Sequence, residues 1–572
     1  MPNADADINR RKFLKATTAG GVVGMTALAG CGGSSDTETE SEGGSDGDDS
    51  GGGGGDGGGG GGGQDMGDQL PSYTYLNNPA NYNAARHDAI NLIGTQLNEL
   101  GLDVSVEVFE WGTLYERATQ QFEYGFTTWN RGLGIYPGTR LPEQFHSDNI
   151  DPGGGNFTGY VNEDLDPMLR EQLRIADVDE RVDMLHEIQS VLAEDVPMHP
   201  IVQMPAVIAF NNQQVEGWTD HLAGYYHMEP MTNIEVTADH NELRGSWSET
   251  LGTLSVMGYN NETKLIHQFE VLYDKLVRNN SNLEADPELS LATEWERPDA
   301  ETVRYRIREG HSWHDGEDLT PEDVVFTLQY IQENQIPLYS TQWELYDSVE
   351  QDGQWVQVNF NQAVGPVHQT FSNQIPIIPE HIWSERDEPN NTQVTEPIGS
   401  GPMKFDYWDQ GSELSLVRND DHWRPVNFDR RIWRIIPESS TVWSLLLDGE
   451  LNYLPFSRIG RQLADNQSED QVTVRSAPGD GWWHISSNQR KAGLDDPAVR
   501  QAVMQAVPKE TINQQLLYEF ATPGWNLIGE SFGQYSNPDV PSYQGDIEDG
   551  VSILEEAGYV FDGDGNVHFP AE

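Results

Sequence analysis

Strand-like and helix-like patterns alternate along residues 71–572, and this alternation limits the possible folds more than any other feature of the sequence. A single hydrophobic core stops growing beyond roughly 250–300 residues, so a stretch of this length is expected to form two or three domains. Strands and helices mixed over the whole stretch indicate an α/β or α+β architecture, of which we take α/β as the fold class.

Hydrophobic periodicity places the individual elements. Helices are expected at 87–100, 179–194, 320–335, 495–506 and 550–557, and strands at 104–109, 302–308, 414–418 and 431–436. The clearest helix start is Thr320, which suits the N-cap and is followed by Pro321 at the first helical position. Gly558 is expected to close the last of these helices.

Residues 1–31 read as an export signal rather than as part of the fold. Arg10-Arg11-Lys12 opens a twin-arginine pattern, and the weakly apolar run after it is too short for a membrane-spanning helix. The run ends at Cys31, the only cysteine of the chain, in a context that resembles a lipobox. Lipid attachment at Cys31 is therefore expected, which would anchor the exported chain to the outer face of the cell membrane; the alternative is an incidental thiol.

Residues 32–70 are rich in glycine and acidic side chains and hold no basic residue. Such a stretch cannot bury apolar surface, so it is expected to be a disordered tether. The formal net charge of the chain is −60, and the acidic excess also runs through residues 71–572. Acidic residues spread over a whole protein suit a salt-rich environment that screens their repulsion, so the source is expected to be a halophile. A cationic ligand or partner, the alternative, would need only a local acidic patch. Nucleic-acid binding is not expected, because no basic stripe is present.

A series of short motifs carries a family resemblance. The longest is Tyr305–Phe326, in which a strand, an Arg-Glu-Gly turn, a His-Asp-Gly turn and a helix start follow one another. The supporting motifs are Phe269–Val277, Leu291–Trp295, Gly399–Phe405, Arg418–Trp423, Leu446–Leu451, Asp496–Val503 and Ile553–Tyr559. Together they resemble the family 5 extracellular solute-binding proteins, the dipeptide-, oligopeptide- and nickel-type binding lipoproteins of ABC importers.

The motifs stand in an unusual order. In that family, a motif like Ile553–Tyr559 precedes a strand, a helix ending in Leu-Gly and another strand. Here the matching segments lie at the other end of the chain. They are Ser72–Asn77, the helix ending Glu99–Gly101, Val104–Phe109, Phe157–Asp166 and Arg181–Pro200. We therefore expect a circular permutation whose break lies in the turn-rich stretch Asp562–Asn566. A gene-assembly artefact is the alternative.

The resemblance implies a two-lobed periplasmic-binding-protein-like fold of type II with an extra subdomain. Residues 225–480 would form the first lobe, with the peripheral subdomain at about 285–395. Residues 71–224 together with 481–572 would form the second lobe, so that one lobe is built from both ends of the folded chain.

The resemblance also places the ligand site between the lobes. It suggests a tentative set of binding residues: Trp111, Trp129, Asn130, Arg131, Tyr136, Trp343, Trp482, Trp483 and His484. For each tryptophan, ordinary core packing is the competing interpretation. Peptide binders of the family place an aspartate where Gly134 or Ile135 stands here, and no acid occurs from Thr127 to Arg140. A buried ammonium group needs a partner charge, so a free peptide amino terminus is disfavoured, whereas Arg131 favours a carboxylate or another anion.

The implied function is the extracytoplasmic solute-binding component of an ABC importer, which captures a peptide-like or other small solute and delivers it to a membrane permease. Permease and ATPase subunits are the expected partners, and a monomer without cofactor is expected. The alternative is a surface sensor of the same fold without transport. His311, His314 and Asp315 could be read as metal ligands, but the family motif explains them as a structural turn, so no metal site is assigned. No enzyme is expected, since neither a Gly-x-Ser-x-Gly elbow nor a metalloprotease helix is present.

Overall fold

The computed structural model describes residues 66–222, 224–225, 227–248, 251–258, 270–386, 393–454, 461–543 and 546–571. The expected export signal with Cys31 and residues 32–65 of the expected tether lie outside these described residues. The tether is expected to continue to residue 70, but Met66–Gln69 form strand β1, so the prediction is wrong there. Within the described residues, no helix has both the length and the apolar character that crossing a membrane requires.

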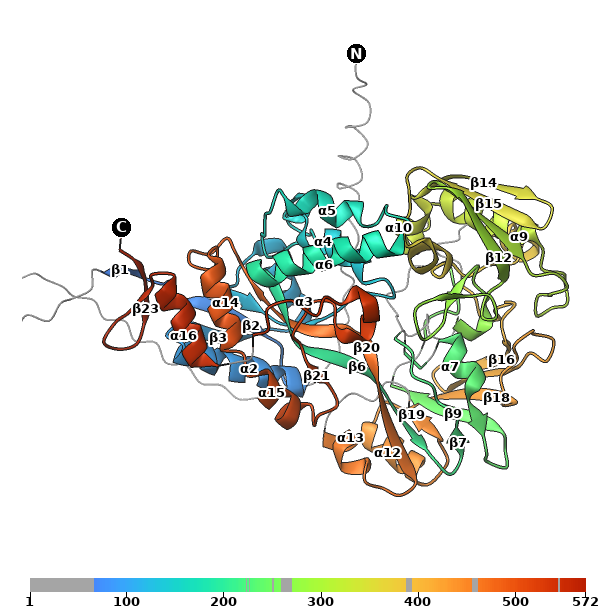
Figure 1. Cartoon of the computed structure of the whole chain (residues 1–572). Coiled ribbons are helices and arrows are strands. Elements are labelled where there is room, and N and C mark those ends of the chain that lie inside the picture. The colour runs from blue at the N-terminus through green and yellow to red at the C-terminus, as the bar shows by residue number, and fades with distance from the viewer. Residues whose placement is uncertain are drawn as a thin grey trace, which may run out of the picture. The chain divides into compact units, whose positions relative to one another are not determined.

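The largest sheet contains eight strands and is built around two long antiparallel strands, β6 (Met198–Asn211) and β20 (Val472–Ser487) (Figure 1). Its path runs β19–β6–β20–β4–β2–β3, while β5 pairs with β20 and β21 pairs with β6. The remaining strands of this sheet are β2 (Tyr73–Asn77), β3 (Val104–Val108), β4 (Phe126–Thr127), β5 (Asn130–Gly132), β19 (Tyr453–Leu454) and β21 (Thr522–Pro523). Strand β2 is parallel to both β3 and β4, so these three strands end at the same edge.

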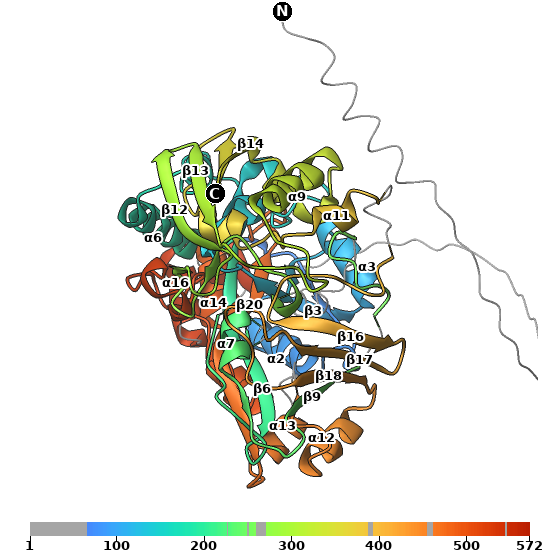
Figure 2. The same ribbon diagram turned by 90° about the vertical axis from the view of Figure 1, so that its right-hand side faces the viewer.

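Two four-stranded sheets come from the middle of the chain (Figure 2). One has the order β12 (Ala292–Asp299), β13 (Thr302–Ile307), β15 (Trp355–Phe360), β14 (Tyr346–Asp352) and is antiparallel throughout. The other has the order β16 (Met403–Asp409), β17 (Glu413–Arg418), β18 (Arg430–Ile435), β9 (Glu242–Trp247), with β18 and β9 parallel. Short pairs join β10 (Arg278–Asn279) to β11 (Ala285–Asp286) and β7 (Val215–Glu216) to β8 (Glu235–Val236).

The described helices are mostly short. They are α2 (Ala84–Glu99), α3 (Trp111–Glu116), α4 (Leu141–Phe145), α5 (Leu165–Glu171), α6 (Val178–Asp195), α7 (Met228–Asn233), α9 (Pro321–Glu333), α10 (Ser340–Trp343), α11 (Glu380–Trp383), α12 (Ser439–Leu447), α13 (Arg461–Asn466), α14 (Pro497–Gln505), α15 (Lys509–Thr511) and α16 (Ile547–Glu556). Every helix and strand expected from periodicity is present, with ends shifted by a few residues. Helix α9 begins with the expected Thr320 cap, and Asp323 completes a capping box.

The two long strands connect separate hydrophobic cores. Ile201 and Val202 of β6 and Ile485 of β20 pack in a core formed by segments from both ends of the folded chain. Ile208 and Ala477, further along the same two strands, pack in a core formed mainly by residues 208–433. The described residues nevertheless form one unit by their internal contacts, and the β6–β20 ladder, with two register shifts, runs between the two cores.

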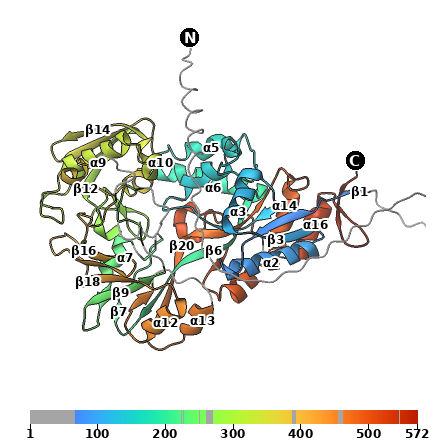
Figure 3. The ribbon, with the colours of Figure 1, turned by 180° about the vertical axis from the view of Figure 1, so that it is seen from behind.

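The first and last described segments lie side by side (Figure 3). Strand β1 (Met66–Gln69) pairs antiparallel with β23 (Val567–Pro570), which also pairs with β22 (Val560–Phe561). Backbone hydrogen bonds continue this contact, since Leu70 donates to Val567 and Val567 donates to Gly101. Gly101 has a φ of +96°, and a Cβ there would lie 2.4 Å from the carbonyl oxygen of Gly565. The turn after α2 therefore requires glycine to admit the C-terminal hairpin.

Candidate functional site

The carboxyl ends of β2, β3 and β4 meet at one edge of the large sheet. In open α/β sheets this edge is where ligands bind, because the loops that follow parallel strands converge there. Each of the three strands is followed at once by chemically distinctive residues: Asn78 after β2, Trp111 at the start of α3 after β3, and Trp129 after β4. The antiparallel β20 runs beside β4 and brings Trp482 and His484 to the same edge.

Aromatic rings form a continuous cluster at this edge. The ring of Trp129 is 5.9 Å from Trp111, 4.8 Å from Phe157 and 5.1 Å from His484, measured between centroids. Tyr82 stacks on Trp111 at 5.7 Å, and Tyr115 contacts both Trp111 and Trp129. Trp129 and Phe157 are buried, whereas Tyr82 and Tyr115 are 43% and 45% exposed, so the cluster runs from the core to the surface.

Two arginines lie against these rings, and neither forms an ion pair within the described residues. The guanidinium of Arg131 is 5.1 Å from the centroid of Phe157, and that of Arg86 is 5.5 Å from the centroid of Trp111. The side chain of Arg131 makes no hydrogen bond or ion pair to any residue in the described ranges, and Nη2 of Arg86 is buried without a hydrogen-bond partner there. Burial lowers the pKa of Arg131, so its charge is held at a cost that a bound anion would offset.

His484 contacts the rings of Trp129 and Trp482 and lies within the electrostatic influence of both arginines. Its Nδ1 is 2.8 Å from Oγ of Ser486, while its Nε2 is buried and has no partner among the described residues. Burial lowers the pKa of His484 well below its usual value, and the charges of Arg131 and Arg86 lower it further. The imidazole is therefore neutral near pH 7. Trp482, whose ring is 5.5 Å away, also leaves its Nε1 buried without a partner in the part of the chain described.

The 127–140 segment contains no acidic residue, but strand β20 places an aspartate beside it. Asp480 of β20 accepts a hydrogen bond from the backbone N–H of Gly134 at 3.0 Å, and its carboxylate lies against Gly132. Burial raises the pKa of Asp480, while the Gly134 N–H acts in the opposite direction. A carboxylate thus lies beside the loop that Arg131 begins, although the local sequence contains none.

The other residues of the tentative set lie in different surroundings. Asn130 is exposed beside the cluster, and Tyr136 is buried nearby, donating to Gln172 Oε1 at 2.7 Å. Trp483 points to the opposite face of β20 from Trp482 and packs in a different core. Trp343 ends α10 in the middle of the chain and donates from its Nε1 to the carbonyl of Ile336. Trp111, Trp129, Arg131, Trp482 and His484 are therefore the members that the fold gathers at one place.

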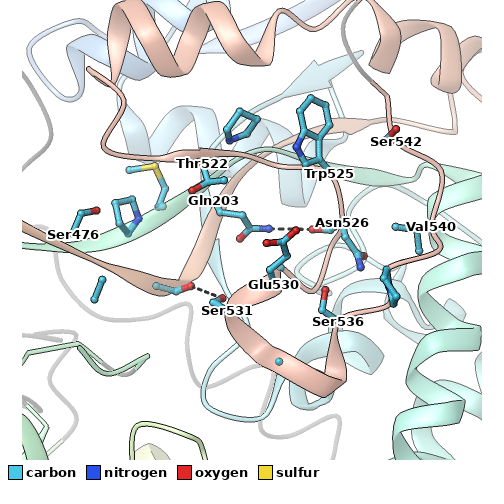
Figure 4. A pocket seen from close by; sticks show the side chains of 18 of the residues that line it. Gln203, Ser476, Thr522, Trp525, Asn526, Glu530, Ser531, Ser536, Val540 and Ser542 are labelled. Atoms are coloured by element: carbon cyan, nitrogen blue, oxygen red, sulfur yellow. Dashed lines mark hydrogen bonds between the residues drawn. The ribbon is translucent and has the colours of Figure 1, made fainter. Parts of the chain in front are cut away.

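A cavity of about 1070 Å³ opens on β6, β20 and the loop after β21 (Figure 4). Gln203 and Gly479 line it together with Trp525, Asn526 and Glu530. Gln203 donates to the carbonyl of Asn526 at 3.0 Å, and Ser531 lies against Gly479. None of the tentative binding residues lines this cavity, but Gly479 precedes Asp480 on β20. We give more weight to the edge cluster, because it holds unpaired charged and polar groups as well as rings.

The neutral state of His484 predicts a pH effect on stability. Its folded pKa lies well below the unfolded value of about 6.5, so the unfolded chain takes up a proton that the folded chain does not. Stability is then lost as pH falls below about 6.5, with a contribution approaching about 1.4 kcal/mol per pH unit from this histidine. Between pH 6.5 and 5, His484→Gln is expected to reduce the slope of the unfolding free energy against pH by up to about 1.4 kcal/mol per pH unit. Chemical denaturation at several pH values measures it, with exposed His381→Gln as control. An unchanged slope in the His484 variant would contradict the assignment.

Sequence patterns alone missed Tyr82, Arg86, Tyr115, Phe157 and Asp480. Arg86 lies one residue before the helix expected at 87–100, whereas the observed helix α2 already includes it, so the expected helix offered no helical phase that would place it against Trp111. For Phe157 and Asp480 only tertiary structure supplies the signal, since they lie 28 and 351 residues away from Trp129 along the chain.

Comparison with known proteins gives a consistent result. A sequence profile described as "Bacterial extracellular solute-binding proteins, family 5 Middle" matches residues 286–569. The oligopeptide-binding protein AppA of Bacillus subtilis is 28% identical over 271 residues, which are 44% of this chain and 48% of the relative. The dipeptide-binding protein of Escherichia coli is 25% identical over 292 residues, which are 47% of this chain and 54% of the relative.

Among solved structures, NikA from Brucella suis in complex with Fe(III)-EDTA is similar, with a TM-score of 0.47 and 19% identity. That match covers 57% of this chain and 66% of NikA. The chain spans about half the length of the curated relatives it matches.

Proposed function

The chain belongs to family 5 of the bacterial extracellular solute-binding proteins, and from this premise we propose that it is the solute-binding component of an ABC importer for a solute that carries a carboxylate. The observation that carries the proposal is Arg131, a cation that lies against Phe157 beside neutral His484 and whose side chain makes no ion pair or hydrogen bond in the described residues. Guanidinium groups bind carboxylates through paired hydrogen bonds, and the surrounding rings suit an apolar solute body.

Asp480 extends this proposal to zwitterionic solutes. Its carboxylate lies next to Gly132, one residue from Arg131, yet no ion pair forms between the two side chains in the described structure. A solute with a carboxylate at Arg131 and an ammonium group at Asp480 would neutralise both charges. The curated relatives above are named for oligopeptide and dipeptide binding, and peptides carry both groups. A peptide-like solute is therefore our preferred class.

Capture is proposed to occur by closure of two lobes. Residues 71–224 with 481–572 would form one lobe and residues 225–480 the other, with the peripheral subdomain at about 285–395. The separate cores at the two ends of the β6–β20 ladder support two lobes, although Ile208, Val215 and Trp218 pack in the core of residues 225–480, which favours a crossing within β6 rather than at residue 224. A permease and an ATPase would be the partners, and export with a lipid at Cys31 would place the site outside the cell.

We also propose that the order of the segments is a circular permutation. In support, β23 pairs with β1, and the chain beyond β1 enters β2 of the large sheet. The curated matches extend over about half of each relative, as expected when an alignment that preserves order meets a rearranged chain. A rearranged protein running from residue 246 to 572 and then from 71 to 245 through a short glycine linker is expected to fold and bind the same solute with affinity within about threefold. If the rearranged protein fails to fold while the chain in its given order folds normally, the circular permutation would be contradicted.

The acidic surplus leads to a prediction on salt. With a net charge of −60, self-repulsion should weaken the folded state at low ionic strength and should be screened by molar salt. The melting temperature is expected to rise by at least about 10 °C between 0.1 M and molar potassium chloride. Differential scanning fluorimetry measures this rise, and a melting temperature that does not change with salt would contradict a halophilic origin.

The test of the binding function starts from the purified full-length chain. Native mass spectrometry in a gentle volatile buffer is expected to show one small molecule per chain, and extraction followed by mass spectrometry should show that it carries a carboxylate. In parallel, thermal shift against peptides, amino acids and organic acids should find a stabilising solute. A folded chain that retains nothing and is stabilised by none of these solutes would contradict the proposal.

A further inference from the structure

Three buried metal-ligand side chains meet far from the edge cluster. They are Asp274, which is fully buried, His311 in the turn after β13, and His422 in the turn after β17. The neighbours His314 and Asp315 point elsewhere: His314 bonds the backbone of Gly399 and Gly401, and Asp315 pairs with His381. The grouping therefore joins three segments distant in sequence rather than the His-x-x-His-Asp run itself.

The distances within the group match a four-coordinate metal site. Nε2 of His311 is 3.1 Å from Asp274 Oδ2, and Nε2 of His422 is 3.3 Å from Asp274 Oδ1. The carbonyl oxygen of Ser400 lies 3.0 Å from the same His311 nitrogen. Bonds of about 2.0–2.1 Å to a tetrahedral Zn²⁺ require its ligand atoms to stand about 3.3 Å apart. Two imidazole nitrogens, one carboxylate and one carbonyl would complete such a shell.

The surroundings hold these side chains in place. His422 Nδ1 lies 2.9 Å from the carbonyl oxygen and 3.0 Å from the backbone nitrogen of Arg424, so this edge of the ring is held by the backbone while Nε2 faces Asp274. The His422 ring stacks on Trp423 at 3.9 Å, and the His311 ring meets Trp423 edge-on at 4.7 Å. Ser400 is held by its Oγ, which accepts from the backbone N–H of Asp274. The site would thus need little rearrangement to accept an ion.

Charge also favours a cation at this point. Within the described residues, the only ion-pair contacts of the Asp274 carboxylate are to the two imidazoles, and no lysine or arginine reaches it. A buried carboxylate needs a compensating charge, because its transfer from water is costly. Moreover, one N–H of His311 faces two oxygen acceptors, which a single metal ion would satisfy together.

We propose that Asp274, His311 and His422, with the carbonyl of Ser400, form a structural site for a divalent transition metal, most suitably Zn²⁺. Two imidazoles and one carboxylate are a donor set that Zn²⁺ accepts readily, and full burial is typical of structural rather than catalytic sites. The ion would fasten the segment at Asp274 to the turns that follow β13 and β17. It would be bound as the chain folds, since the folded site is closed to solvent.

The test uses the full-length chain, unfolded in denaturant with EDTA, refolded with Zn²⁺ and passed over a chelating resin that removes ions held by surface carboxylates. Elemental analysis is expected to find about one Zn²⁺ per chain, and removal of the ion should lower the melting temperature by at least about 4 °C. His422→Phe keeps a ring on Trp423 but removes a ligand, and should weaken Zn²⁺ binding at least about 100-fold. His381→Gln, which alters an exposed His–Asp pair, is the matched control and should leave binding unchanged.

Cobalt provides a readout that does not depend on any variant. Co²⁺ in a four-coordinate site of nitrogen and oxygen ligands absorbs visible light strongly, whereas six-coordinate Co²⁺ on surface carboxylates absorbs weakly. The wild-type chain should therefore show the four-coordinate spectrum with one equivalent of Co²⁺. A folded wild-type chain that retains no ion, or shows only the six-coordinate spectrum, would overturn the site. Equal retention by a folded His422→Phe variant would overturn it as well.

Discussion

Replacing Glu270 by glutamine is expected to lower the free energy of unfolding by about 3–5 kcal/mol, the largest effect on stability among these predictions. Glu270 is 7% exposed and forms ion pairs with both Lys275 and Arg278. Burial alone would raise the pKa of Glu270, but the charges of Lys275 and Arg278 outweigh burial and hold that pKa well below its usual range. The carboxylate is therefore ionised in the folded chain and compensates two buried cations.

The size of the effect follows from what the substitution leaves behind. Arg278 is fully buried and also donates to the backbone carbonyls of Glu270 and Tyr273 at 2.9 and 2.8 Å, so it cannot turn to solvent without breaking these bonds. Glutamine keeps the shape of the side chain but removes its charge, and removing one partner of a buried ion pair is far more costly than losing an exposed pair.

Chemical denaturation followed by circular dichroism measures this prediction. The matched control is Glu294→Gln, which removes an acid from an exposed pair with Arg306 and should change the unfolding free energy by less than about 1 kcal/mol. Equal unfolding free energies for the two variants would show that the Glu270 pairs contribute no more than a surface contact.

Local patterns predicted the elements well where the local sequence determines them. The start of α9 follows from Thr320, Pro321 and Asp323, whose capping geometry needs only neighbouring residues. Periodicity placed α6 and β13 within a few residues of their observed ends, because each has one buried face. The pairing of β6 with β20 could not be predicted in this way, since it joins segments more than 250 residues apart.

The candidate site shows the same limit. The sequence did not show which of the adjacent Trp482 and Trp483 would face the site. Successive residues of a strand point to opposite faces, and in the structure only Trp482 reaches the aromatic cluster. The 127–140 segment does lack an acidic residue, as the sequence shows. The inference that the site therefore lacks a carboxylate was incomplete. Asp480 arrives beside Gly134 through strand pairing between β5 and β20, which no spacing within either segment reveals.

Replacing Arg131 by glutamine is expected to weaken binding of the solute recovered from the purified chain by about 30-fold to several thousand-fold, equivalent to about 2–5 kcal/mol. The proposed reason is that the guanidinium carries the positive charge that would pair with the carboxylate of the solute, beside a neutral His484. Isothermal titration calorimetry on the solute-free chain measures the loss. Arg140→Gln, on the same loop but exposed, is the control and should change the affinity less than threefold.

The stability of the solute-free variant separates a binding role from a structural one. Burial lowers the pKa of Arg131, the charge of Glu143 opposes this effect without outweighing it, and no ion pair to Arg131 forms in the described residues. Removal of a partly buried charge that has no ion-pair partner should therefore leave the unfolding free energy of the empty protein unchanged or raise it, while affinity falls. A structural arginine would behave in the opposite way, with lower stability and little change in the affinity of the protein that remains folded. If Arg131→Gln loses stability and keeps its affinity, the carboxylate does not bind at Arg131, and Arg86, which lies against Trp111, becomes the cation to test.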